Sequence, residues 1–267
     1  MRIGTFTPDP SLARHIQCFT VLELDGSAAF GSPERILPDG IVEIVFHYGA
    51  PFAMRYAGES FRMQPTSLAV SQTRRFVEIR PTGRSGFVSA RLFPWGACRL
   101  FELPVEEFAD RSIPAQELWG EDAARLEERL ALAGSRRERV RALQSFLRGK
   151  LREDRNSALE GWVRAIRNRR GDVAVSGLCA ELGVGERSLE RGFREGLGMT
   201  PKQFARLTRF LEACRALRSG GWTSLAELAL ACGYADQAHF NRNMKDFSGL
   251  TPRQFLAENQ VSFLGSE

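Results

Sequence analysis

The chain has 267 residues and a formal net charge of +5, and 43% of its residues are hydrophobic. This composition suffices for packed cores and excludes a disordered or fibrous chain, while the length predicts two domains. No run of ~18 apolar residues occurs, and the first ten residues lack the apolar centre of a secretory signal, so we expect neither a membrane span nor export.

The five cysteines are scattered, with no C-x-x-C pair among them: Cys18, Cys98, Cys179, Cys214 and Cys232. A dispersed, odd-numbered set is typical of reduced thiols in a cytoplasm. We therefore expect a cytoplasmic protein. The three cysteines of the carboxyl-terminal half are expected to be buried as small apolar filler.

Residues 1–118 are predicted to form a β-rich domain. The clearest strand is the β-branched run Ile41–Phe46, which lies between Pro38-Asp39-Gly40 and Gly49-Ala50-Pro51. Further strands are expected at Cys18–Leu24, Ser67–Val70, Phe76–Arg80 and Phe87–Phe93. Gly and Pro separate these runs at short intervals, which is typical of a small barrel or sandwich.

Residues 119–154 are predicted to be a helical connector. Gly134 separates two helices, and Ser135 with Glu138 forms a capping box that begins the second. Along that second helix, apolar residues form a seam close to a heptad: Val140, Leu143, Leu147 and Leu151. Two interpretations remain open, namely a helix packed on its own β domain and a dimerisation helix. A charged linker is expected at 152–157.

Residues 155–267 carry most of the basic excess. They contain 16 Lys and Arg against 12 Asp and Glu, a balance of +4, whereas residues 1–154 contain 21 against 20, a balance of +1. A positive surface favours an anionic partner. The excess is modest, so the decisive signal must come from motifs.

The stretch 225–255 predicts two short helices across a tight turn, followed by the start of a third. Ser224 and Glu227 cap the first helix, and Gly233 ends it. In the second helix, Phe240, Met244 and Phe247 share an inward face. The opposite face is polar, amide-rich and basic, as a helix that reads the major groove requires.

The same pattern occurs once earlier in the chain. Leu189-x-Arg191-x-Phe193 repeats as Phe240-x-Arg242-x-Met244 at an offset of 51 residues. Gly198-x-Thr200-Pro201-x-x-Phe204 repeats as Gly249-x-Thr251-Pro252-x-x-Phe255 at the same offset. The sequence therefore predicts two copies of one helical module. The helix over 201–218 joins them and would span roughly 27 Å, somewhat less than one duplex turn of about 34 Å.

On these residues, the region 160–258 resembles the tandem helix-turn-helix DNA-binding domain of the AraC/XylS family of bacterial transcription regulators. The second copy carries the family signature in Leu228-Ala229, Gly233-Tyr234, His239-Phe240, Arg242, Gly249 and Thr251-Pro252. Three positions depart from the pattern: Met244 replaces the usual Phe, Leu256 a common Arg, and Gly185 the usual Ser cap.

The resemblance implies an α+β protein of two domains: an amino-terminal, cupin-like small β-barrel with helices and a carboxyl-terminal all-α tandem helix-turn-helix. The segment ILPDGIVEIVFHYG resembles the amino-terminal domain often fused to this family. The resemblance also implies that double-stranded DNA is a partner. Further partners that it implies are a small-molecule effector, RNA polymerase and a second copy of the chain. No cofactor is implied.

The outward residues of the two predicted recognition helices are the candidate DNA contacts. Arg187, Arg191 and Arg242 suit guanine, Gln237 and Asn241 suit adenine, and Glu190 suits the cytosine amine. Arg194 and Lys245 are expected to position phosphates. The alternative for any one of these side chains is an exposed residue that only solubilises its helix.

Two features of the β domain raise the question of catalysis. His47 shares a strand face with Glu43, as in metal-binding cupins, but a metal site needs three or four ligands, and the chain has only three histidines. His47 is therefore expected to be hydrogen-bonded within the barrel. Cys98 lacks the Pro-Cys-His-Arg context and four-cysteine zinc site of the alkyl-transfer domains fused to some relatives, and is expected to pack.

The sequence thus predicts a DNA-binding regulator of transcription rather than an enzyme. One alternative is a DNA-binding protein whose β domain is only an assembly or partner-binding surface. The other is an enzyme fused to a DNA-binding domain. The operator, the effector and the sign of regulation do not follow from the sequence.

Overall fold

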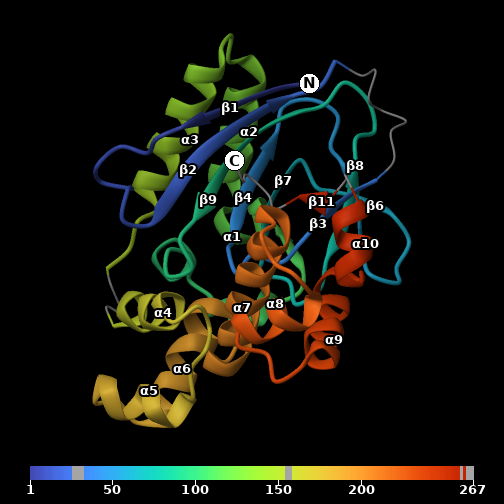
Figure 1. The fold of residues 1–267 in the computed structure, drawn as a ribbon. Helices are drawn as coiled ribbons and strands as arrows, with labels where there is room; N and C mark the ends of the chain where they lie inside the picture. Colours follow the sequence, from blue (N-terminus) through green and yellow to red (C-terminus); the bar gives the residue numbers. More distant parts are fainter. Residues whose placement is uncertain (26–32, 154–157, 259–260, 263–267) are drawn as a thin grey trace.

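The computed structural model describes residues 1–25, 33–153, 158–258 and 261–262. Figure 1 shows a sheet-rich amino-terminal part above a helical carboxyl-terminal part, as the α+β, two-part prediction requires. All five cysteines lie in the described ranges, and none forms a disulfide. Cys214 is buried, but Cys179 and Cys232 are only half-buried, so just one of the three predicted filler cysteines is fully enclosed.

The larger sheet has six antiparallel strands in the order β1-β2-β9-β4-β7-β10. Their bounds are β1 Arg2–Phe6, β2 Ile16–Glu23, β4 Glu43–His47, β7 Ser67–Val70, β9 Gly86–Leu92 and β10 Ser112–Pro114. Strand β4 is buried along its whole length. Because side chains alternate along a strand, Ile44 and Phe46 enter the main core while Val45 joins a small cluster on the other face.

The smaller sheet has the order β11-β3-β8-β5-β6. Its strands are β3 Glu34–Ile36, β5 Ala53–Tyr56, β6 Arg62–Met63, β8 Val77–Arg80 and β11 Val261–Ser262. Strand β11 comes from the far end of the chain and pairs parallel with β3. Between the described strands, no backbone pairing joins this sheet to the larger one, so a closed barrel stays a prediction.

The five predicted strands all form, with bounds that shift by a few residues. Strand β4 begins at Glu43 instead of Ile41 because the Ile41 N–H donates to Asp39 Oδ1 at 3.1 Å and prolongs the turn. Strand β8 begins at Val77 because the Phe76 N–H donates to the Phe247 carbonyl at 2.9 Å. Strands β1, β3, β5, β6, β10 and β11 were not predicted; most are short or partly exposed.

The connector forms the predicted helices. Two short 3-10 turns, η1 Ala97–Arg99 and η2 Val105–Phe108, precede α1 Ala115–Trp119, α2 Glu121–Leu132 and α3 Arg136–Gly149. The Ser135 side chain caps α3 by accepting from the Glu138 N–H. Helix α3 packs on β2 and β9, and Figure 1 shows it next to the larger sheet.

The apolar seam of α3 faces the chain's own core. Val140, Leu143 and Leu147 are 6%, 0% and 0% exposed and belong to the same cluster as β4. Leu151 packs against that cluster half-buried. Of the two interpretations of the seam, the structure therefore favours a helix packed on its own β domain, and these side chains are not free for a second copy.

The carboxyl-terminal part contains seven helices within the described residues. They are α4 Leu159–Asn168, α5 Val175–Leu182, α6 Glu186–Leu197, α7 Pro201–Ser219, α8 Leu225–Ala231, α9 Gln237–Ser248 and α10 Pro252–Ala257. The predicted inward residues Phe240, Met244 and Phe247 are buried. Both modules share one core that runs along α7.

The repeated cap signals act as predicted. Thr200 begins α7 and Thr251 begins α10, each in a capping box that is completed by the glutamine three residues later. Gly198 and Gly249 end the helices before them with φ of 69° and 73°. This left-handed backbone favours glycine, so the two glycines recur in the repeat.

The two parts pack against each other through a shared core and hydrogen bonds. Leu37 and Trp95 of the amino-terminal part belong to the core of the helical part. Arg35 Nη1 donates to the Ser248 carbonyl at 3.3 Å. Of the predicted linker, 154–157 lie outside the described residues, and Arg152 is tied to Arg99 through its backbone N–H at 2.9 Å. In the described ranges, no helix has both the length and the apolar character needed to cross a membrane.

Candidate DNA interface

Helix α6, the second helix of the first module, presents the predicted basic face to solvent. Arg187, Arg191 and Arg194 are exposed, and Glu190 is half-buried. On the opposite face, Leu189 and Phe193 are fully buried. The 3.6-residue period of the helix thus separates a packing face from a polar face as the sequence predicted.

Helix α9 is its counterpart in the second module. Gln237, Arg242 and Lys245 are exposed, and Asn241 is half-buried. The Asp236 side chain caps the helix by accepting from the His239 N–H at 2.6 Å. Within the described residues, Asn241 Oδ1 has no hydrogen-bond partner.

A buried hydrogen bond, which sequence analysis did not single out, stiffens the second module. The Tyr234 hydroxyl donates to Asn243 Oδ1 at 2.9 Å. Burial raises the pKa of Tyr234, so the phenol stays protonated and remains a donor. The sequence could have indicated this hydrogen bond, because Asn243 follows Phe240 by three residues and therefore lies on the inward face of the helix.

The candidate contacts differ in their charge pairing from the cations of the connecting helix. On α7, Arg206 pairs with Asp246, Arg209 with Asp172 at 3.4 Å, and Arg215 with Glu212. By contrast, in the described part of the chain no ion pair engages the basic candidates on α6 and α9: Arg187, Arg191, Arg194, Arg242 and Lys245. These cations remain available to phosphates or base edges.

The connecting helix places the two recognition helices on either side of it. Helix α7 contacts both α6 and α9, and Figure 1 shows it between them. Its 19 residues form a rod of roughly 28 Å. The structure therefore joins two similar polar faces by one rigid element.

The candidate catalytic residues of the amino-terminal part are engaged in packing. His47 Nε2 lies 3.1 Å from Gln64 Oε1, and burial lowers the pKa of His47 to about 4, so the ring is neutral. Among the described residues, no three potential ligands are grouped to hold a metal ion. Cys98 Sγ donates to the Trp95 carbonyl at 3.1 Å.

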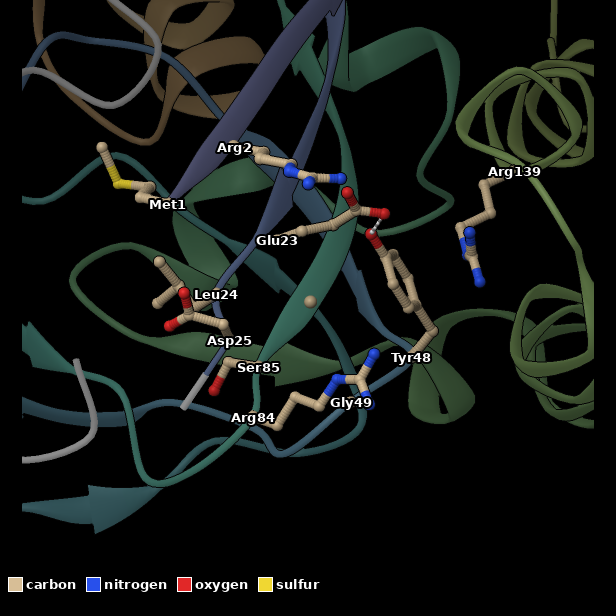
Figure 2. Close-up of a pocket in the computed structure, with 11 residues that line it drawn as sticks. Met1, Arg2, Glu23, Leu24, Asp25, Tyr48, Gly49, Arg84, Ser85 and Arg139 are labelled. Atoms are coloured by element: carbon tan, nitrogen blue, oxygen red, sulfur yellow. Dashed lines mark hydrogen bonds between the residues drawn. The ribbon is translucent and has the colours of Figure 1, made fainter. Parts of the chain in front are cut away.

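Two large cavities lie outside the candidate DNA contacts. The first, of about 830 Å³, opens between β1, β2, the start of β9 and α3. Figure 2 shows Tyr48 pointing toward Glu23 there, at 3.4 Å, with Arg139 on the other side of the ring. The second, of about 650 Å³, lies between the sheet-rich part and helices α4 and α7.

Two family models match separate regions of the chain. Residues 178–258 match a family described as a helix-turn-helix domain. Residues 4–114 match a domain of unknown function, DUF6597.

Curated relatives match about a third of the chain. The HTH-type transcriptional activator RhaS of Pectobacterium atrosepticum is 31% identical over 96 residues, which cover 36% of this chain and 33% of RhaS. The probable transcription factor PqrA of Proteus vulgaris is 28% identical over 94 residues, which cover 35% of this chain and 76% of PqrA. The chain thus matches about a third of the length of RhaS. Among solved structures, ToxT from Vibrio cholerae aligns with 90% of this chain and 97% of its own, at 12% identity and a TM-score of 0.47.

Proposed function

Because the carboxyl-terminal helices of this chain belong to the AraC/XylS family of helix-turn-helix DNA-binding domains, we propose that the chain is a sequence-specific regulator of transcription. One observation carries the proposal most directly. In the described residues, both copies of the module present cationic side chains without an ion-pair partner to solvent on equivalent helices, and α9 adds the amides of Gln237 and Asn241. Such faces provide base readout and phosphate positioning.

The proposed DNA contacts are those that the sequence indicated, with Arg194 and Lys245 as phosphate contacts and the others as candidate base contacts. On α6 they are Arg187, Glu190, Arg191 and Arg194, and on α9 they are Gln237, Asn241, Arg242 and Lys245. The rod-like α7 supports a model in which both helices enter successive major grooves on one face of the duplex.

We propose that the amino-terminal part, residues 1–118, is a cupin-like regulatory domain that responds to a small molecule. Residues 119–154 would serve as connector and 155–267 as the DNA-binding domain. The regulator acts in the cytoplasm on nucleoid DNA, is not an enzyme, and contacts RNA polymerase when it activates. The two large cavities described above and the core that the two parts share support control by a ligand.

Selection of bound fragments from random or genomic DNA with the full chain tests the proposal. We expect one enriched motif with two half-elements about one helical turn apart. Affinity for that motif should fall with salt, each neutralised phosphate adding about −0.9 to the slope of log K against log salt. Failure to enrich any motif, together with a flat salt response, would contradict sequence-specific binding.

Self-association is a further proposal, and it now requires a surface other than the α3 seam, whose side chains are buried in the chain's own core. The mass in solution at tens of micromolar tests it directly. A mass that corresponds to a monomer under these conditions would contradict the proposed homodimer. The two modules of a single chain would then bind DNA without a second copy.

A further inference from the structure

The cavity between the two parts is built from both of them. The amino-terminal part contributes Asp39 and Arg91, and helices α4 and α7 contribute Arg167, Glu212, Arg215 and Arg218. Ile41, Phe204 and Leu211 supply apolar wall. Its volume of about 650 Å³ falls within the range of small-molecule sites, roughly 300–1,000 Å³.

Arg91 is the most enclosed cation of this cavity. It is only 6% exposed, and its Nη2 donates to Asp39 Oδ2 at 2.7 Å. Within the described residues, Nη1 of the same guanidinium has no hydrogen-bond partner. Glu43 on the neighbouring strand also attracts this guanidinium but does not line the cavity. A buried, unsatisfied donor is costly, and a ligand oxygen in the cavity would accept from it.

Arg167 faces the same cavity from α4. It is half-buried, and across the described ranges it forms no ion pair. Burial lowers the pKa of its guanidinium, and the attraction of Asp39 opposes that effect. Arg215, by contrast, is paired with Glu212, and its side chain is 66% exposed, so it marks the solvent-facing edge.

The charge of the lining favours an anion. Four arginines stand against the two carboxylates of Asp39 and Glu212, a balance of +2. Guanidinium groups bind carboxylate and phosphate oxygens through paired N–H donors. The apolar wall leaves room for a compact hydrocarbon body next to the charged group.

We propose that this cavity binds a small organic oxyanion, a carboxylate or a phosphomonoester, whose charged group bridges Arg91 of β9 and Arg167 of α4. The inference rests on the proposed function, since it identifies the chemistry of the regulatory ligand. The occupant would touch both the sheet-rich part and helices α4 and α7, of which α7 joins the two DNA-reading modules. A ligand that prefers this arrangement shifts its population and thereby the affinity for DNA.

Thermal unfolding of the full chain with three probes of similar size tests the proposal: phthalate, phenyl phosphate and the uncharged benzyl alcohol. An anionic probe at one hundred times its Kd should raise Tm by roughly 5–10 °C. Phthalate and phenyl phosphate separate the carboxylate from the phosphate source. Benzyl alcohol should give no comparable shift.

Variants locate the site. Arg167→Met should weaken probe binding at least about tenfold. Arg167→Lys keeps the charge but loses the planar guanidinium, so its affinity for the probe should lie between those of Arg167→Met and the wild type. Arg164→Met is the matched control: this residue lies on the same helix, pairs with Glu160 and stacks on Trp95, and does not line the cavity. It should bind the probe as the wild type does.

Operator affinity measured without a probe separates the two proposals. If the wild type binds its operator but no anionic probe raises Tm, or if Arg167→Met and Arg164→Met respond alike, the inference about the cavity is overturned and the proposed function stands. If no operator is bound, the proposed function fails whatever the probes do. A change of operator affinity on adding the probe, absent in Arg167→Met, is the expected result.

Discussion

The two helix-turn-helix modules have the same backbone design but are stabilised by different means. The second module, α8 and α9, carries its own polar supports, with Asp236 as helix cap and the Tyr234–Asn243 hydrogen bond in its core. In the first module, α5 and α6, the corresponding positions are Gly185, Val184 and Gly192, and α6 begins without a side-chain cap.

The first module instead relies on neighbouring elements. Gly196 occupies the place of Phe247, and Leu159 of α4 fills the space: a Cβ added at Gly196 would lie 2.2 Å from Leu159 Cδ2. Helix α6 also packs on the turns η1 and η2 of the amino-terminal part. The comparison indicates that the first module depends mainly on α4 and the turns η1 and η2. The second module adds polar supports of its own to the hydrogen bonds that Phe76 and Arg35 donate to the end of α9.

The largest effect is expected from Phe240→Ala in the second module. Phe240 is fully buried, so its truncation should cost about 3–5 kcal/mol of unfolding free energy. Because the first module is packed against α4, η1 and η2, hydrogen exchange should accelerate mainly in α8 and α9. Equal acceleration in α5 and α6 would show that the modules unfold as one unit and would break the comparison.

The reading faces should differ as well, because the first carries more arginine. Arg191→Ala and Arg242→Ala should each cost about 1–3 kcal/mol on the selected operator if each contacts guanine in bidentate fashion. We expect Arg191→Ala to lose more sequence discrimination, and Arg242→Ala to lose affinity partly as a phosphate contact would.

Binding of both variants to operator and to scrambled DNA at one salt concentration checks this ranking. Small, equal losses on both DNAs would exclude base reading by either arginine. A larger specific loss at Arg242 would show that the second module dominates recognition.

Removal of the buried hydrogen bond should also distinguish the modules. Tyr234→Phe leaves Asn243 Oδ1 buried without its donor, and we expect a loss of about 1–3 kcal/mol. Chemical denaturation measures it. Val184→Thr in the first module is the comparison, since the position that corresponds to Asn243 is Gly192 there. An unchanged free energy of unfolding in Tyr234→Phe would mean that water replaces the hydroxyl group as the donor to Asn243.

The smallest effects concern the caps. Asp236→Ala should destabilise by about 1 kcal/mol, because the His239 N–H loses its acceptor. Gly185→Ser should stabilise by a few tenths of a kcal/mol, because it adds the missing cap to α6. Measurements of Tm on the two variants show whether each substitution raises or lowers the stability. Destabilisation by Gly185→Ser would show that the turn of the first module needs glycine.

The sequence predicted the helical repeat well because its signals are local. The caps at Thr200 and Thr251, the end glycines and the inward spacing of Phe240, Met244 and Phe247 each depend on residues within one or two helical turns. The outward faces of α6 and α9 then follow from the helical period alone. The assignment of individual side chains to bases stays a prediction.

The sheet-rich part was less predictable, since strands need partners distant in the chain. Arg62–Met63 has no apolar pattern, and Val261–Ser262 forms a strand only by pairing with Glu34–Ile36. The apolar seam of α3 predicted a buried face, but it fitted two partners equally well: the chain's own β domain and a second copy of the chain. Only tertiary structure showed that the chain's own β2 and β9 cover it.

By itself the sequence thus determined two helix-turn-helix modules, a rod between them and a β-rich part before them, because hydrogen bonds and periodicity act over short distances. The tertiary structure alone decided how Arg91, Asp39 and Arg167 meet in one cavity. These residues come from a strand, a turn and a helix that are far apart in the chain. The sequence around each of these residues does not predict that packing. It results from the burial of Leu37, Trp95 and Phe204, which are distant in the chain, in one shared core.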